Sequence, residues 1–149
     1  MTTSHGAGTA LREWPVIGAV AAGGALGAAA RYGVSLAWPA APDAFPWAIL
    51  WINAVGCALI GVLMAVLDEA RRPHRLLRPF VGTGVLGGFT TFSTYAVDVH
   101  RLVDRGEART AVAYLAGTLV VALAAVALAA GATRRVLERR SGTRGRPGR

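Results

Sequence analysis

Four long apolar runs decide what this chain can fold into. An α-helix needs about 20 residues to cross the hydrocarbon core of a bilayer. The chain is 54% hydrophobic, and its apolar residues gather into runs of that kind instead of recurring at amphipathic spacing. We therefore expect an all-α, multi-pass membrane protein with four transmembrane helices, at residues 15–37, 47–67, 79–99 and 111–132.

The segments outside these runs are too short for a soluble domain. We expect an N-terminal tail at 1–14, a four-helix transmembrane domain at 15–133 and a disordered Arg-rich tail at 134–149. The net charge is +8, but all 16 basic residues are Arg, and most lie in a tail or in a loop beside a run. Such charges indicate topology and contact with anionic membrane lipid, so we expect no nucleic acid partner.

The distribution of Arg also predicts the orientation. If the chain crosses the membrane four times, both termini and the loop between the second and third runs share one side. Twelve of the 16 Arg residues lie on that side and four on the other. Because short cytoplasmic loops carry an excess of positive charge, we expect both termini to be cytoplasmic, in the plasma membrane of a bacterial cell.

The third run contains a segment that a simple spanning helix does not need. Residues 87–95 read Gly-Gly-Phe-Thr-Thr-Phe-Ser-Thr-Tyr. Each Gly costs a helix about 1 kcal/mol relative to Ala, and Ser and Thr compete for backbone hydrogen bonds. We therefore expect the third helix to be broken in mid-membrane. Freed backbone groups are tolerated there only if they are buried in protein or line a wet cavity, so the break marks a candidate site.

Three polar or aromatic side chains stand out near this break. Asn53 is the only carboxamide of the chain and lies inside the second run. It serves either as an interhelical hydrogen-bonding group or as an amide that faces a passing anion. Phe92 and Tyr95 are three residues apart and share one face if the helix resumes. They either pack or present the positive edges of their rings to an anion.

The first and fourth runs add further candidates. Tyr114 and Thr118 form a short polar stripe, although a hydroxyl can also bond its own helix backbone. Arg31 lies near the end of the first run and is either a snorkelling anchor or a cation at the entrance for an anion. Gly23 and Gly27 are four residues apart, which allows another helix to approach closely.

Several function classes lack the residues that they require. The centres of the four runs contain no Asp, Glu, Lys or His, so a proton-coupled antiporter would lack its titratable group. Cys, His and carboxylate residues show no metal-ligand spacing, and no nucleophile has a base and an orienting partner. We expect a protein that is not an enzyme.

Three motifs together resemble the Fluc (CrcB) fluoride channels. They are Gly-Gly-Ala-Leu-Gly-Ala-Ala-Ala-Arg-Tyr at 23–32, Asn-Ala-Val-Gly at 53–56, and the segment at 87–95. The resemblance covers residues 16 to 132. It implies a passive, fluoride-selective channel that exports cytoplasmic fluoride and so lowers its toxicity. It also implies an antiparallel, dual-topology dimer with two pores and a structural sodium ion (Na+) at the subunit interface.

The resemblance assigns roles to the matching residues. It implies a fluoride pore lined by Asn53, Phe92, Tyr95, Tyr114 and Thr118. It implies a vestibule residue, Arg31, and sodium ligation by the backbone carbonyls of Gly87 and Thr90. Two positions depart from the family pattern: Tyr95 adds a hydroxyl where Phe is common, and Ala122 gives the fourth run no second hydroxyl one turn beyond Thr118.

Some alternatives stay open at this stage. The biased Arg distribution raises the possibility of a heterodimer with an oppositely oriented paralogue in place of a homodimer. A small four-helix multidrug exporter has a similar length but needs a membrane carboxylate, which the first run lacks. A noncatalytic membrane scaffold with a polybasic tail would leave the predicted break unexplained.

Overall fold

The computed structural model describes residues 5–39, 44–70 and 74–144 of the chain, and within these ranges the regular structure is entirely helical. The elements are α1 (His5–Ala37), α2 (Trp47–Glu69), η1 (Arg78–Leu86), α3 (Gly87–Phe89), α4 (Ser93–Asp104) and α5 (Ala108–Arg144). The expected all-α class is confirmed.

Three of the helices are long and apolar enough to cross a membrane. They are Glu13–Ala37 within α1, Trp47–Glu69 in α2 and Ala108–Arg140 within α5. The shortest, with 23 residues, is about 35 Å long at 1.5 Å per residue, which exceeds a hydrocarbon core of about 30 Å. They correspond to the first, second and fourth predicted runs. The third predicted run is divided among η1, α3 and α4.

The outer helices extend further than the apolar runs. α1 begins at His5 and contains Pro15, and α5 continues to Arg144, where the sequence predicts tails at 1–14 and 134–149. After Thr133, the chain continues with Arg, Val, Leu and Glu and reaches its next glycine only at Gly142. Because adding residues to an existing helix is far easier than starting one, this stretch prolongs α5. Residues 1–4 and 145–149 lie outside the described ranges.

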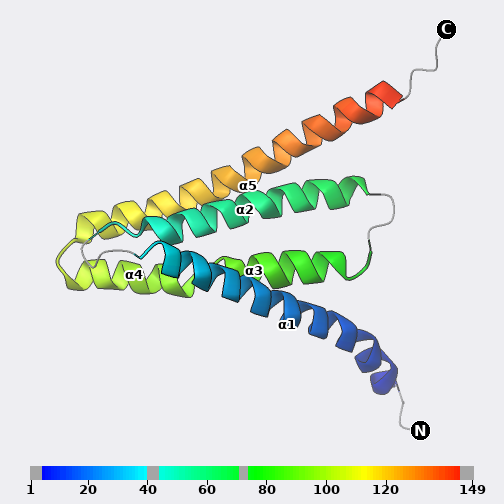
Figure 1. The fold of residues 1–149 in the computed structure, drawn as a ribbon, viewed down its shortest axis with the longest axis horizontal. Helices are drawn as coiled ribbons and strands as arrows, with labels where there is room; N and C mark the ends of the chain where they lie inside the picture. Colours follow the sequence, from blue (N-terminus) through cyan, green and yellow to red (C-terminus); the bar gives the residue numbers. More distant parts are fainter. Residues whose placement is uncertain (1–4, 40–43, 71–73, 145–149) are drawn as a thin grey trace.

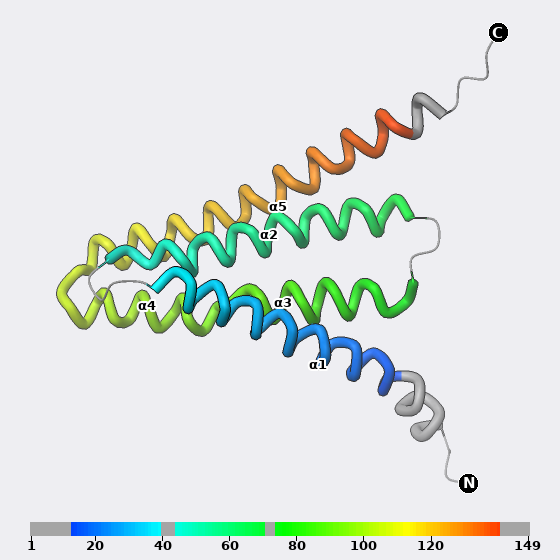
Figure 2. Tube along the Cα trace, viewed as in Figure 1, coloured from blue at the N-terminus to red at the C-terminus, as the bar shows by residue number. Residues whose placement is uncertain are grey.

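The helices form an elongated bundle. α5 packs along α2, and α1 packs along η1 and α3 (Figure 1). The end of α2 and the start of η1 lie at the same end of the bundle as the start of α1 and the end of α5, whereas the end of α1, the start of α2 and the short turn between α4 and α5 lie at the opposite end (Figure 2). Beyond its contact with α2, the C-terminal part of α5 diverges from the bundle.

The α1–η1 contact depends on glycine. A Cβ atom on Gly27 would overlap the carbonyl oxygen of Val85, and one on Gly23 would overlap that of Phe80. The two backbones therefore approach more closely than any larger residue permits, as the spacing of these glycines predicts.

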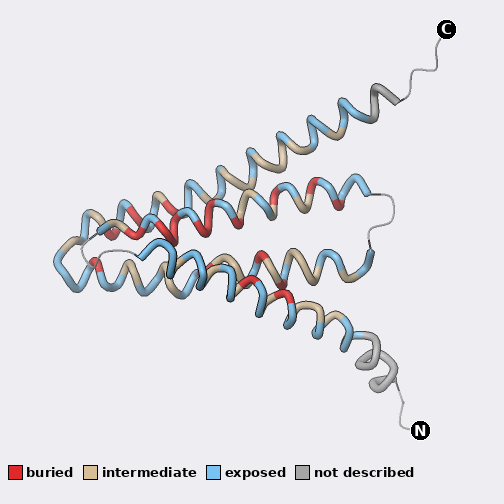
Figure 3. Tube along the Cα trace, in the orientation of Figure 1, coloured by how far each residue is buried: buried red, intermediate tan, exposed pale blue. Residues whose placement is uncertain are grey.

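Burial is concentrated where α2, α4 and α5 meet (Figure 3). Leu50, Leu102, Ala111 and Tyr114 form a buried cluster there. In contrast, many large apolar side chains of α1 and α5 are exposed, for example Leu26, Leu36, Leu123 and Leu128. Such exposure is expected for a chain that is surrounded by lipid or by another subunit.

Candidate functional site

The helical backbone is interrupted between Phe89 and Ser93. α3 ends at Phe89, Thr90 is extended with φ −73° and ψ 157°, and α4 begins at Ser93. The nine residues before α3 form a π-helix, and the N–H of Gly87 donates to the carbonyl of Gly82, five residues back. π-Helical turns of this kind are rare in proteins, and those that do occur often lie at functional sites.

The amide of Asn53 caps this interruption. Its Nδ2 donates to the Thr91 carbonyl over 3.0 Å, and its Oδ1 accepts from the Thr91 N–H over 2.9 Å. Both residues are buried. Asn53 thus satisfies both backbone groups of a residue that has left the helix, and one of its two Nδ2 hydrogens is used in doing so. Of the two interpretations from sequence, the interhelical hydrogen bond is present.

Thr91 is a second capping residue, and it is not among the site residues predicted from the sequence. Its Oγ1 accepts from the N–H of Thr94 over 3.2 Å and hydrogen-bonds the Thr94 hydroxyl over 3.1 Å. Thr91 therefore starts α4 with its side chain while Asn53 binds its backbone. The signal was available, because Thr followed three residues later by Thr matches a local side-chain-to-backbone turn.

Because the N–H groups of Thr91 and Thr94 bind side chains, two backbone carbonyl groups lose the donors that a regular helix would give them. In a regular helix the N–H of Thr91 would donate to Gly87, and the N–H of Thr94 would donate to Thr90. Here the donors bind Asn53 and the Thr91 hydroxyl instead. Among the residues that the structure describes, no backbone N–H bonds the carbonyl of Gly87 or Thr90. These are the two carbonyls that the sequence resemblance assigns to a cation.

Arg31 reaches the segment between these carbonyls. Its Nε donates to the carbonyl of Gly88 over 3.3 Å, and the residue is half-buried. The guanidinium group therefore links α1 to α3. Neither sequence-based interpretation of Arg31, an anchor or an entrance cation, includes this contact.

A cavity of about 540 Å³ lies between α2, the interruption with α4, and α5. Five of the residues predicted for the site line it: Asn53, Thr90, Phe92, Tyr95 and Thr118. Arg31, Gly87 and Tyr114 are not among its lining residues. Cys57, one turn after Asn53, also lines the cavity. The walls are mainly apolar and contain no formally charged side chain among the described residues.

The aromatic side chains differ in exposure. Phe92 is 79% exposed, and its ring centroid lies 5.8 Å from that of Tyr95. The Tyr95 ring lies 5.3 Å from that of Tyr114, which is fully buried. The Tyr95 hydroxyl donates to the Leu115 carbonyl over 2.6 Å, so its single hydrogen ties α4 to α5.

The hydroxyls of Tyr114 and Thr118 are buried; the Asp98 carboxylate interacts with the Tyr114 hydroxyl, whereas the Thr118 hydroxyl has no hydrogen-bond partner in the described part of the chain. Leaving a polar group buried and unpaired costs roughly 1–3 kcal/mol. Native proteins usually resolve this cost with an ordered water or an ion. Thr118 faces the same cavity as Asn53, so a polar species in the cavity has a hydroxyl to bind.

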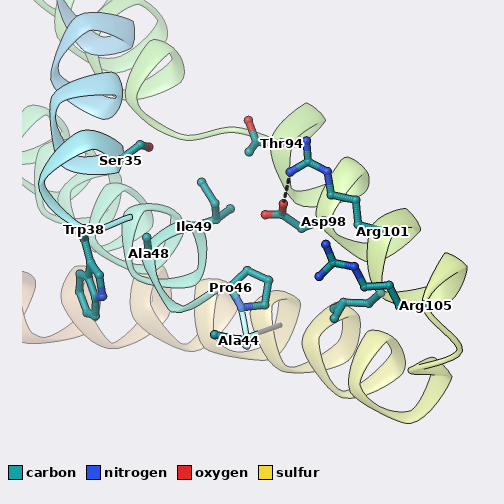
Figure 4. Close-up of a pocket in the computed structure, with 11 residues that line it drawn as sticks. Ser35, Trp38, Ala44, Pro46, Ala48, Ile49, Thr94, Asp98, Arg101 and Arg105 are labelled. Atoms are coloured by element: carbon teal, nitrogen blue, oxygen red, sulfur yellow. Dashed lines mark ion pairs between the residues drawn. The ribbon is translucent and has the colours of Figure 1, made fainter. Parts of the chain in front are cut away.

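A second cavity, of about 430 Å³, lies on the other face of α4 (Figure 4). Thr94, Asp98 and Arg101 line it from α4, Arg105 lines it from the C-cap of that helix, and Ser35 is contributed by α1. The Asp98 carboxylate lies 3.7 Å from the Arg101 guanidinium. α4 thus separates a mainly apolar cavity from a charged one near the α1–α2 connection.

The sequence matches the profile of the family described as "CrcB-like protein, Camphor Resistance (CrcB)" over residues 18–131. "Fluoride-specific ion channel FluC 1" of Streptomyces coelicolor is 60% identical over 124 residues, 83% of this chain and 80% of that protein. "Fluoride-specific ion channel FluC 2" of Thermobifida fusca is 54% identical over 130 residues, 85% and 94% of the two chains. The FluC 2 protein of Nocardia farcinica is 52% identical over 116 residues, 78% and 83%.

These relatives confirm the resemblance found in the three sequence motifs. The profile covers all three long apolar helices in part or in full and the whole interrupted segment between α2 and α5. The chain belongs to the CrcB-like family.

Proposed function

We propose that this protein is a fluoride-selective, passive ion channel that exports fluoride from the cell. The observation that carries the proposal is its identity of 52–60% to relatives named fluoride-specific ion channels. The protein is a channel and not an enzyme. A negative-inside membrane potential favours anion exit by about 2.3 kcal/mol per 100 mV, so export needs neither ATP nor proton coupling.

The cavity between α2, α4 and α5 forms part of the fluoride route. It offers the Asn53 amide, the Thr118 hydroxyl and the edges of the Phe92 and Tyr95 rings. These groups attract an anion weakly, whereas a buried Lys or Arg would hold it. Conduction requires this balance, because the ion must leave as readily as it enters. The charged cavity beside Arg101 and Arg105 is a suitable aqueous mouth.

The third membrane crossing consists of η1, α3 and α4 in series. Together they run from Arg78 to Asp104 between the two ends of the bundle. The break at Thr90 then lies in mid-membrane, and Asn53 and Thr91 compensate its backbone. With four crossings both termini share one side, which the excess of Arg there assigns to the cytoplasm.

The functional unit is an antiparallel dimer of dual-topology type, formed by two copies or by this chain and an oppositely oriented paralogue. The high exposure of Phe92 supports this, since a partner would cover the ring. The carbonyls of Gly87 and Thr90 suit a sodium ion, which prefers hard oxygen ligands, and a second subunit would supply the further oxygens that one chain lacks. When bound, the ion would hold the two subunits together.

The test is fluoride efflux from liposomes that contain the purified chain alone. Potassium-loaded vesicles with sodium present receive valinomycin, and an electrode follows external fluoride against a chloride control. We expect rapid fluoride efflux without chloride efflux, and a strong reduction in Phe92→Ala. If neither the chain alone nor the chain co-expressed with a paralogue releases fluoride from vesicles that hold folded protein, the proposed function is wrong.

A further inference from the structure

An ion cluster joins three helices at the end of the bundle where α2 ends and η1 begins. One Asp68 carboxylate oxygen lies 3.4 Å from Nη2 of Arg78, and the other lies 3.7 Å from Nη2 of Arg134. The three residues belong to α2, η1 and α5. A single carboxylate thus holds two guanidinium groups near each other, and the cluster keeps an excess of positive charge.

The two guanidinium groups are exposed to solvent, and their N–H groups can donate further hydrogen bonds. The side chains of Arg78 and Arg134 are 60% and 61% exposed. Apart from Asp68, the acceptor that contacts Arg78 within the described ranges is the Met64 sulfur, at 3.6 Å. Since each guanidinium carries five N–H groups and sulfur is a weak acceptor, most donors of the pair remain for an external oxyanion.

The cluster lies at the boundary between apolar and polar surface. Asp68 directly follows the apolar run of α2, and Arg134 lies two residues after the end of that of α5. Exposed apolar side chains of α5, including Leu123 and Leu128, lead up to it. With 37 residues, α5 is about 55 Å long, longer than a hydrocarbon core of about 30 Å, so its Arg-rich end emerges from the bilayer.

We propose that the Arg78–Asp68–Arg134 cluster binds the phosphate group of an anionic phospholipid, whose acyl chains lie along the exposed apolar face of α5. The phosphate replaces water on the outward N–H groups of both guanidiniums. The excess positive charge, to which Arg135 adds as the next residue, selects an anionic headgroup over a zwitterionic one, which carries its own cation. The proposal requires a membrane-spanning chain and is independent of fluoride conduction.

The test uses the full chain in a neutral maltoside detergent. Thermal unfolding is followed by tryptophan fluorescence while dimyristoyl phosphatidylglycerol or dimyristoyl phosphatidylcholine is added. The two lipids share acyl chains and differ in the headgroup. We expect phosphatidylglycerol to raise the unfolding temperature more than phosphatidylcholine does, and inorganic phosphate at the same concentration to have no effect.

Two variants of α5 locate the site. In Arg134→Gln the concentration of phosphatidylglycerol for half the maximal shift should rise about fivefold, as expected for the loss of one interfacial Arg. Arg109→Gln, at the opposite end of the same helix, should leave it unchanged. Asp68→Asn keeps both guanidinium groups and removes the carboxylate that competes with phosphate for their N–H groups. It should therefore lower the half-maximal concentration of phosphatidylglycerol.

Three results would overturn the proposal. Equal shifts with the two lipids would show that the headgroup is not recognised. An equal loss in Arg109→Gln and Arg134→Gln would indicate a general charge effect. A shift with inorganic phosphate that matches the lipid would assign the cluster to a soluble anion. Because Asp68→Asn is predicted to strengthen binding, a folding defect cannot imitate the expected pattern.

Discussion

Replacing Asn53 by alanine tests how the helix interruption between α3 and α4 is stabilised. The change removes the hydrogen bonds of 2.9 Å and 3.0 Å to the backbone of Thr91 and leaves a buried N–H and a buried carbonyl unpaired. Each unpaired group costs roughly 1–3 kcal/mol. The adjacent cavity admits water, which offsets part of this cost. We expect the free energy of unfolding to fall by about 2 to 4 kcal/mol.

The assay is reversible unfolding in mixed detergent and SDS micelles, with Cys57→Ala as the matched control. Cys57 lies one turn from Asn53 and lines the same cavity, but its truncation removes no hydrogen bond to Thr91. We expect it to cost no more than about 1 kcal/mol, because the half-buried thiol contributes one heavy atom to the packing. If Asn53→Ala is no less stable than Cys57→Ala, the capping role of the amide is refuted.

A second substitution at the same position separates stability from conduction. Asn53→Asp keeps an acceptor for the Thr91 N–H but loses the donor to its carbonyl. It also places a carboxylate beside the proposed fluoride route, where it would repel an anion. We expect the liposome assay to show less fluoride efflux with Asn53→Asp than with Asn53→Ala. Equal or greater efflux with the aspartate would place the route away from this residue.

Three further predictions follow from single contacts. Tyr95→Phe loses the hydrogen bond to the Leu115 carbonyl but keeps the ring, so the free energy of unfolding should fall by about 1 kcal/mol. The control Tyr32→Phe, which removes an exposed hydroxyl, should leave the free energy of unfolding unchanged. Gly27→Ala drives a methyl group into the Val85 carbonyl and should cost about 1–3 kcal/mol or more in the same assay, whereas Gly33→Ala meets no atom within 4 Å and should not destabilise. Replacing sodium by N-methylglucamine during purification should dissociate the proposed dimer on size-exclusion chromatography, and a dimer that persists would contradict the proposed structural sodium ion.

Hydropathy alone predicted the three described helices that are long and apolar enough to cross a membrane, because length and apolar content suffice to identify such a helix. The position of the helix interruption could also be inferred locally, since paired Gly and clustered hydroxyls act on their own backbone. The hydrogen-bond partners of this segment could not be inferred in the same way. Asn53 and Thr91 are 38 residues apart, and Arg31 and Gly88 are 57 apart. Such contacts depend on how the helices pack, which a residue pattern in one segment does not encode.

The lengths of α1 and α5 show a second limit of prediction from hydropathy, because both helices continue beyond the apolar runs. Hydrophobicity predicts helices that stop where the apolar runs stop, so both helices were expected to be shorter than they are. Helix propagation depends instead on backbone propensity, and Arg, Leu and Glu are good helix formers whatever their solvent. The apolar run therefore marks the membrane-facing length, whereas the helix ends where Gly and Pro accumulate near the C-terminus.

Asn53 connects the proposed anion route with the proposed cation site. By taking the Thr91 N–H, the amide removes the donor that a continuous helix would give to the Gly87 carbonyl. Removing the amide would free that N–H to return to Gly87 and compete with a cation for the same oxygen. Asn53→Ala dimers should therefore need a higher sodium concentration to persist than Cys57→Ala dimers. If both variants respond equally to sodium, the Gly87 carbonyl is made available by the break itself and not by Asn53.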